Sequence, residues 1–320
     1  MLPEINNYEP PITSIWQGRK DSLPHERFFQ AIKAYDIRIH SLQDIKSQTV
    51  FLGFNSDEGI RRNEGRLGAK EGPMALREQL AKLPWHAKRQ LYDLGNIACK
   101  QQDLEEAQHQ FADIIRQCHE HHCKTIALGG GHEIAWGHFL GLTNHYPKLG
   151  VINFDAHFDL RPTNQANQST SGTPFYQIQR YCASKNRPFN YCCLGIQPHA
   201  NTESLFKLAK DYNVSFLTAQ QMNELGLKQQ IKFIKEFISK QEAIYLSICL
   251  DTFAEAFAPG VSAPQALGLL PGQAVPLLQY IIQTGKVVSI DIAELSPPLD
   301  QGQKTARLAA MLIAELLESY

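Results

Sequence analysis

The chain has 320 residues, of which 43% are hydrophobic and 20% charged, and its 31 basic and 32 acidic side chains nearly cancel. This balance is typical of soluble globular proteins and offers no broad electrostatic attraction for nucleic acid or anionic lipid. No apolar run approaches the roughly 20 residues that a membrane helix needs, and the first residues lack the pattern of a secretory signal. We therefore expect a cytoplasmic protein that acts on a small molecule, without nucleic acid or membrane partners.

Short β-branched or apolar runs alternate along the chain with amphipathic stretches of helical length. This alternation predicts an α/β fold in which helices connect the strands of a mostly parallel sheet. About eight strands are expected, at residues 49–54, 90–95, 125–130, 150–157, 190–196, 214–219, 243–251 and 287–295. The clearest helices are expected at residues 103–122, 227–241 and 305–319.

The sequence contains no internal repeat, low-complexity segment or linker that would divide it. We expect one α/β domain spanning residues 1–320, with the irregular, proline-containing residues 1–45 as an N-terminal extension packed on it. The seven cysteines are odd in number and unevenly spaced within apolar stretches, which favours reduced and mostly buried thiols.

Polar side chains follow several of the expected strands. In an open parallel sheet, ligands bind beyond the carboxyl ends of the strands. Alternate side chains of an extended segment leave on one side, so the acidic and histidine residues of DAHFDLR (155–161) are expected to converge. Carboxylates and imidazoles together suit a divalent ion such as Mn²⁺, and their number suggests two ions. The alternative interpretation of DAHFDLR is a loop whose polar side chains only form hydrogen bonds. The candidate ligands are His132, Asp155, His157, Asp159 and Asp251.

Two other features are better explained by structure than by chemistry. Asp291, near the end of the last expected strand, is more simply a turn residue or a helix cap. The run CHEHHC (118–123) resembles a metal cluster, but it falls in the last turns of an amphipathic helix. Histidines there also suit the negative end of the helix dipole, so we expect a structural role.

The motifs resemble those of the ureohydrolases, the arginase and agmatinase superfamily of dimanganese hydrolases. The resemblance runs from about residue 50 to residue 320 and implies an arginase-like, three-layer α/β/α sandwich. It is carried in order by EGPMALR (71–77), GGGHE (129–133), DAHFDLR, SICLD (247–251) with APGVSAP (258–264), and DIAELSP (291–297). Details resemble the formimidoylglutamases: WQGRKD (16–21), DEGIRRNEGR (57–66), and SGTPF (171–175), in which Phe175 replaces a proton-shuttling histidine of arginases.

The resemblance implies hydrolysis of the amidine C–N bond of N-formimidoyl-L-glutamate to L-glutamate and formamide by a metal-activated hydroxide, a step of histidine degradation. It implies two Mn²⁺ ions, a homo-oligomer (a trimer or hexamer), and the five candidate ligands as metal ligands, with Asp155 as a bridging carboxylate. Asp159 would also move the proton, and Glu294 would hold the cationic amidine. Arg62, Arg66 and Arg161 would bind the substrate carboxylates, although each arginine can equally be a surface charge or part of a salt bridge.

Cys249 departs from the family pattern, which has an aspartate at this position. A thiolate is softer than Mn²⁺ prefers, and a neutral thiol leaves the cluster short of one negative charge. Cys249 can ligate a metal, sit idle beside a single ion, or mark lost catalysis. A non-catalytic metal-binding role therefore stays open. Hydrolysis of another amidino or guanidino compound, as in agmatinases or guanidinobutyrases, is a separate alternative.

Overall fold

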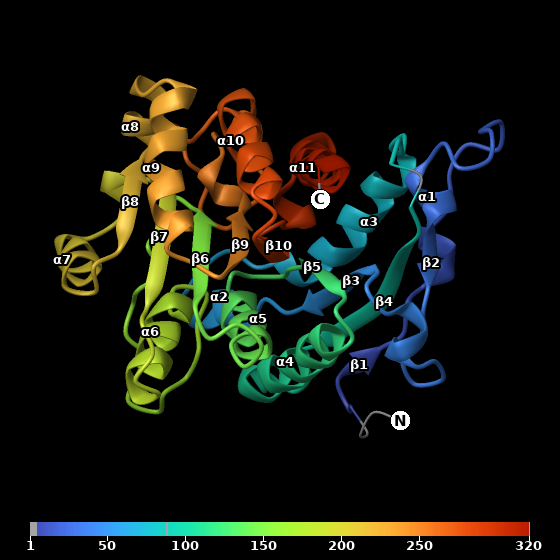
Figure 1. Ribbon diagram of the computed structural model, residues 1–320, viewed down its shortest axis with the longest axis horizontal. Coiled ribbons are helices and arrows are strands. Elements are labelled where there is room, and N and C mark those ends of the chain that lie inside the picture. The colour runs from blue at the N-terminus through green and yellow to red at the C-terminus, as the bar shows by residue number, and fades with distance from the viewer. Residues whose placement is uncertain (1–4, 88, 320) are drawn as a thin grey trace.

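A computed structural model describes residues 5–87 and 89–319, and it contains a ten-stranded, mostly parallel sheet with helices on both faces (Figure 1). The predicted α/β class and all eight predicted strands are confirmed, with shifts of a few residues at their ends. The strands are β1 (Tyr8–Glu9), β2 (Ile32–Ala34), β3 (Thr49–Asn55), β4 (Leu91–Ala98), β5 (Lys124–Leu128), β6 (Leu149–Phe154), β7 (Asn190–Ile196), β8 (Ser215–Thr218), β9 (Ala243–Cys249) and β10 (Val287–Ala293).

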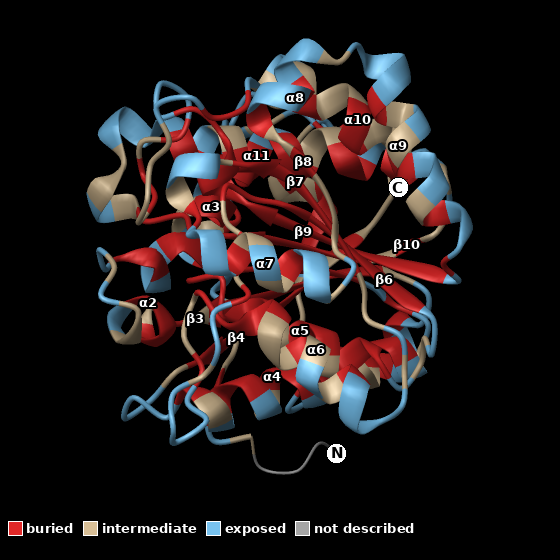
Figure 2. Ribbon diagram, turned by 90° about the vertical axis from the view of Figure 1, so that its left-hand side faces the viewer, coloured by how far each residue is buried: buried red, intermediate tan, exposed pale blue. Residues whose placement is uncertain are grey.

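The helices form two layers. In Figures 1 and 2, α3 and α8 to α11 lie on one face of the sheet, and α4, α5 and α6 lie on the other. The bounds are α1 (Phe28–Ala31), α2 (Glu58–Arg62), α3 (Gly72–Lys82), α4 (Leu104–Glu120), α5 (Ile134–Leu142), α6 (Pro174–Ser184), α7 (Glu203–Asp211), α8 (Ala219–Glu224), α9 (Leu227–Ser239), α10 (Pro271–Gln283) and α11 (Lys304–Ser319).

Each face of the sheet is buried in its own apolar core. Neighbouring residues of one strand point to opposite cores: Phe51 packs on the side of α3 and α11, and Leu52 packs on the side of α4. Burial on both faces explains why the strands read as continuous apolar runs. Within the described residues, no helix is both long and apolar enough to cross a membrane.

The order of the strands decides which loops meet. The sheet runs β1-β4-β3-β5-β10-β9-β6-β7-β8, and β2 pairs with β4. β5 and β6 follow one another along the chain, yet β10 and β9 lie between them, and all four strands are parallel. The loops that follow these four central strands therefore emerge side by side at one edge of the sheet.

The N-terminal segment supplies two strands that the sequence analysis did not anticipate. β1 pairs antiparallel and β2 parallel with β4. Trp16 of WQGRKD donates from Nε1 to Asp93 Oδ2 at 2.8 Å, and Arg77 of EGPMALR donates from Nη2 to Asp93 Oδ1 at 2.8 Å. These two motifs thus meet at one buried carboxylate and attach the N-terminal segment to the sheet. Residues 1–4 lie outside the described residues, and the predicted single domain with an extension at 1–45 stays a prediction.

The CHEHHC run lies at the end of α4 and in the turn before β5. His119 is buried, with Nδ1 3.0 Å from the Tyr146 hydroxyl and Nε2 3.1 Å from Thr125 Oγ1. Cys118 and Cys123 are also buried. Across the described part of the chain, no residue of this run belongs to a group of side chains close enough to share an ion. This placement supports the structural role predicted for the run.

The burial of His119 has a consequence for acid stability. Burial, with smaller contributions from His138 and His145, lowers the pKa of His119 to about 3 from 6.5. The unfolded chain therefore binds the additional proton below about pH 6.5. The stability that neutral His119 contributes is complete above that pH and is lost as the pH falls, by up to about 1.4 kcal/mol per pH unit. We expect His119→Gln to flatten the pH dependence of urea unfolding between about pH 4 and 7, whereas parallel curves for both proteins would contradict this.

Candidate metal centre and active site

The turn between β5 and α5 carries GGGHE and places His132 at the edge of the sheet. A Cβ atom at Gly130 would lie 1.9 Å from the carbonyl oxygen of Ser56, so this position tolerates only glycine. The glycine lets the turn pack directly against the loop that follows β3. Gly131 donates from its backbone N to that same Ser56 carbonyl at 3.0 Å. The close packing holds His132 next to the arginine-rich loop.

The DAHFDLR segment converges on the site, but not for the reason predicted. β6 ends at Phe154, so the acidic residues lie in a loop and not on alternate positions of a strand. Asp159 has a left-handed backbone, with φ of 49°, which non-glycine residues adopt only at a cost. The His157 backbone N donates to Asp155 Oδ1 at 2.8 Å. The curled loop thus turns all three side chains toward the same point.

The five predicted ligands form two groups that share Asp155. His132 Nδ1 lies 3.0 Å from Asp155 Oδ2 and 2.8 Å from Asp159 Oδ2. His157 Nδ1 lies 3.1 Å from Asp251 Oδ2 and 3.5 Å from Asp155 Oδ1. The two oxygens of Asp155 therefore face different groups, as a bridging carboxylate would.

Electrostatics in the cluster favour cations. Burial opposes charge on His132 and His157, but the adjacent carboxylates raise the pKa of both imidazoles well above the usual range. Burial and the Asp155 carboxylate together raise the pKa of Asp159 to about 6. His132 Nδ1 is buried and has no well-formed hydrogen bond among the described residues. Crowded carboxylates around an imidazole nitrogen that makes no well-formed hydrogen bond fit a site for divalent ions.

Glu294 directly follows β10 and also has a left-handed backbone, with φ of 72°. Its Oε1 accepts a hydrogen bond from the His132 backbone N at 2.8 Å. Burial, followed by the nearby Asp251 and Glu133 carboxylates, raises the pKa of Glu294 well above its usual range. A cation placed beside Glu294 would favour its ionised form.

These side chains open into a cavity of about 270 Å³. Two arginines predicted to bind substrate, Arg66 and Arg161, line it together with the metal-ligand candidates His132, His157, Asp159 and Asp251. Sequence reasoning missed Asn63 and Ser171, which also line the cavity, although both belong to motifs that it had singled out. Asn63 Nδ2 donates to Ser171 Oγ at 3.1 Å and so joins the two loops that carry these motifs.

Arg66 and Arg161 differ in how their guanidinium groups are held. Arg66 donates from Nε to the Ser262 carbonyl at 2.9 Å and from Nη2 to the Val261 carbonyl at 2.7 Å. Arg161 is exposed, and its backbone N donates to the Gly172 carbonyl at 2.9 Å. Within the described residues no hydrogen bond or ion pair reaches its guanidinium, so all five of its N–H groups can serve a ligand.

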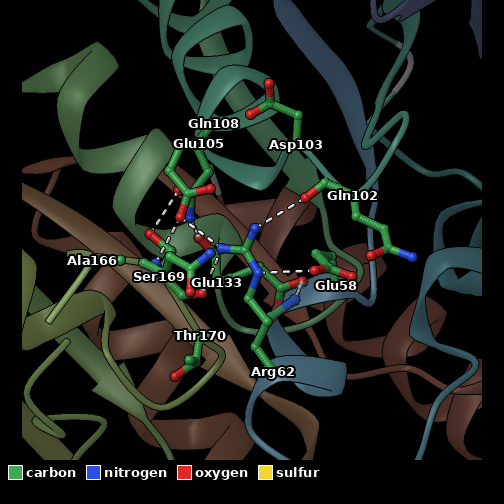
Figure 3. Close-up of polar contacts among 12 residues, drawn as sticks. Glu58, Arg62, Gln102, Asp103, Glu105, Gln108, Glu133, Ala166, Ser169 and Thr170 are labelled. Atoms are coloured by element: carbon green, nitrogen blue, oxygen red, sulfur yellow. Dashed lines mark hydrogen bonds and ion pairs between the residues drawn. The ribbon is translucent and has the colours of Figure 1, made fainter. Parts of the chain in front are cut away.

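Arg62 is part of a salt bridge, which is one of the alternatives to substrate binding that the sequence left open for each arginine. Figure 3 shows its guanidinium among Glu58, Glu105 and Gln102. Nη1 lies 2.7 Å from Glu105 Oε1, Nε lies 2.9 Å from Glu58 Oε1, and the Gln102 and Ser169 carbonyls accept two further hydrogen bonds. Arg62 does not belong to the cavity lining among the described residues. Its position favours a salt bridge that holds the loop.

Asp291 supports the site through hydrogen bonds that reach His132. It lies within β10 and is neither a helix cap nor a turn residue, so that expectation was wrong. His132 Nε2 is 2.9 Å from Ser247 Oγ, which donates to Asp291 Oδ1 at 2.7 Å. The other oxygen, Oδ2, is 2.9 Å from His138 Nδ1 and accepts from the Tyr245 hydroxyl. This buried network fixes the imidazole of His132 with Nδ1 toward the cluster.

We expect Asp291→Asn to weaken metal binding by about tenfold, which is the lower end of the range for residues that hydrogen-bond to metal ligands. The lower end applies because, among the described residues, Asp291 contacts His132 only through Ser247. Competition with a chelator measures the affinity. Asp113→Asn is the matched control, since Asp113 is exposed and pairs with Arg116 on the surface. An unchanged metal affinity in a folded Asp291→Asn protein would contradict the supporting role.

The model of the arginase family matches residues 47–318. Formimidoylglutamase of Legionella pneumophila (strain Lens) is 56% identical over 319 residues, covering 100% of both chains, and that of Geobacillus thermodenitrificans is 40% identical over 318 residues, covering 97% of both.

Solved structures agree in fold. Trypanosoma cruzi formiminoglutamase with Mn²⁺ superposes with a TM-score of 0.78 at 24% identity, covering 88% of this chain and 95% of that one. Bacillus subtilis formimidoylglutamase superposes with a TM-score of 0.77 at 25% identity, covering 90% and 94%. The matched family model and the full-length relatives together establish that this chain belongs to the arginase family.

Proposed function

We propose that this chain hydrolyses N-formimidoyl-L-glutamate at its amidine C–N bond, giving L-glutamate and formamide. The observation that carries this function is the cavity, which is lined both by the carboxylates and imidazoles of the cluster and by Arg66 and Arg161. The substrate has the matching polarity, with a cationic amidine at one end and two carboxylates at the other. The full-length relatives at 56% and 40% identity are formimidoylglutamases, which agrees with this assignment.

The cluster would hold two divalent ions, as the chemistry of its donors favours. His132 and Asp155, with Asp159 next to His132, would bind one ion, and Asp155, His157 and Asp251 would bind the other. Mn²⁺ is the proposed metal because these donors are oxygens and imidazole nitrogens, and because the T. cruzi neighbour contains it. When bound, such ions supply activation of water near neutral pH and polarisation of the substrate.

Three side chains would handle the reacting end of the substrate. The Glu294 carboxylate would pair with the cationic amidine and hold its carbon over the cluster. Asp159, which lines the cavity and whose Oδ2 lies 2.8 Å from His132 Nδ1, would accept the proton of the attacking water and return it to the departing amine. Phe175 packs against His132 with ring centroids 5.4 Å apart, and its apolar ring cannot relay protons. The proton transfer therefore falls to Asp159.

The glutamate end would be recognised by arginine. Arg161 would bind a substrate carboxylate with the two parallel N–H groups of its planar fork. Arg66, whose guanidinium is held by the 261–262 backbone, adds positive charge to the lining of the same cavity. Agmatine is a dication and would be repelled by this pair, and therefore the cavity disfavours an agmatinase-like reaction.

The test is a substrate panel on Mn²⁺-loaded protein: N-formimidoyl-L-glutamate, agmatine, 4-guanidinobutyrate and L-arginine. Released glutamate, in a sample whose metal content is measured in parallel, is the expected result. Preferential turnover of agmatine or guanidinobutyrate would overturn the substrate assignment, and metal content without any turnover would favour the non-catalytic alternative.

Two further properties complete the proposal. A homo-oligomer, either a trimer or a hexamer, is expected from the resemblance, and light scattering coupled to size-exclusion chromatography measures it directly. A cytoplasmic location is expected for an enzyme of amino acid degradation, and fractionation of cells that express the chain tests it.

A further inference from the structure

Cys249 lies at the metal cluster and not in the apolar interior that holds most of the other cysteines. It is the last residue of β9, with 1% of its surface exposed, and it lines the cavity. Its Sγ belongs to a group with a ligand atom of His132 and one of Asp155, all within 4.8 Å of one another. That spacing is short enough for one ion to contact all three atoms.

Cys249 has no competing partner. Within the described residues, no hydrogen bond reaches its Sγ. Cys193 is the informative comparison, because it is equally buried on a nearby strand. Its Sγ lies 3.5 Å from the His157 carbonyl and 3.9 Å from Asn153 Nδ2, and it belongs to no such ligand group in the described part of the chain. The two thiols therefore have different surroundings: the Cys193 thiol already contacts polar partners, whereas the Cys249 thiol faces the cluster.

The imidazole beside Cys249 gives a second, independent indication. His132 Nδ1 is buried, faces the cluster, and lacks a well-formed hydrogen bond among the described residues. Its Nε2 is already occupied by Ser247, so Nδ1 is the atom left for a ligand. The thiol belongs to the same ligand group as His132 and Asp155, so an ion held by those two residues would have the thiol within reach.

We propose that Cys249 binds metal as a thiolate, together with His132 and Asp155, so that one half of the two-ion centre has a sulfur ligand and the other half has none. This inference rests on the proposed metal-dependent function. The thiolate supplies the negative charge that a neutral thiol would withhold from the cluster. The thiolate also gives this half of the centre a softer donor. Zn²⁺ or Co²⁺ therefore competes better with Mn²⁺ there than at the half built from His157 and Asp251.

Spectroscopy on the metal-loaded protein tests the proposal without depending on turnover. The full chain, stripped of metal and reloaded with Zn²⁺ to two equivalents, is examined by X-ray absorption at the zinc edge. We expect a sulfur shell at about 2.3 Å beside nitrogen and oxygen at about 2.0–2.2 Å. With Co²⁺, we expect a sulfur-to-cobalt charge-transfer band in the near ultraviolet.

Two variants assign the sulfur. Cys249→Ser is expected to lose both the sulfur shell and the charge-transfer band, and Cys193→Ser is expected to keep them. A wild-type shell of nitrogen and oxygen alone, or a sulfur shell that survives Cys249→Ser, would overturn the proposal. Formimidoylglutamate hydrolysis is assayed on Mn²⁺-loaded protein from the same preparation, so a sulfur ligand in the zinc or cobalt form without turnover in the Mn²⁺ form would refute the proposed function and leave the ligand assignment standing.

A third variant tests the selectivity. Cys249→Asp replaces the sulfur with an oxygen donor of the same charge, and we expect it to bind two ions and to shift the competition toward Mn²⁺. If the relative affinity for Mn²⁺ and Zn²⁺ is the same in the wild-type protein and in Cys249→Asp, Cys249 does not contact the metal.

Discussion

Replacing Asp155 with alanine is expected to lower kcat/KM by about 10³-fold or more and to reduce the bound metal. Among the described residues, Asp155 is the carboxylate with an oxygen facing each imidazole, Oδ2 toward His132 and Oδ1 toward His157. Its loss would disrupt both proposed ion sites together. Metal ions contribute several kcal/mol to such reactions, and each 1.4 kcal/mol is a factor of ten. Steady-state kinetics and elemental analysis on the same preparation measure both effects.

The isosteric variant Asp155→Asn separates charge from packing. It keeps the volume of the buried side chain and removes its negative charge. We expect it to be about as inactive as the alanine variant, because the charge holds the ions. If either variant keeps more than about a tenth of the wild-type activity, Asp155 does not bridge the two sites.

Replacing Arg161 with alanine is expected to raise KM for N-formimidoyl-L-glutamate by about 100-fold while leaving the metal content unchanged. Two hydrogen bonds to a charged group, at about 1.5 kcal/mol each, amount to about 3 kcal/mol. The lower end of the range applies because Arg161 is exposed. Arg161→Lys is expected to restore only part of the affinity, since lysine lacks the bidentate fork.

Arg62→Ala is the comparison for Arg161. The Arg62 guanidinium is already engaged by Glu58 and Glu105 outside the cavity lining (Figure 3). We expect its removal to affect stability more than KM. An unchanged KM in Arg161→Ala would show that Arg161 does not bind the substrate. A large rise of KM in Arg62→Ala alone would indicate that the substrate carboxylates bind at the loop after β3.

The α/β class and the eight main strands could be predicted because burial on both faces makes each strand an uninterrupted apolar run. The helix expected at residues 103–122 is α4, since its apolar residues repeat with the helical period. β1 and β2 escaped prediction because strands of two and three residues carry no such pattern. Their place is decided by pairing with β4, a contact distant in sequence.

Several strands were predicted too long at their carboxyl ends, and for two of them the chain beyond the strand shows a physical reason. The strand expected to reach residue 157 ends at Phe154, and the one expected to reach 295 ends at Ala293. Asp159 and Glu294 both adopt left-handed backbones that direct the chain, and their side chains, into the cluster. Local propensity does not encode such a conformation at an acidic residue, because the surrounding packing imposes it.

The sequence by itself determined the residue types of the site and their position after strands, because the chemistry of carboxylates and imidazoles and the periodicity of strands are local. The resemblance to the ureohydrolases, and not the local pattern, marked Cys249 as unusual. Only the tertiary structure decided that β10 and β9 lie between β5 and β6, which brings His132, Asp155 and Asp251 together. It likewise decided that Arg161 faces the cavity while Arg62 does not, since a charged side chain takes whichever partners the fold places within reach.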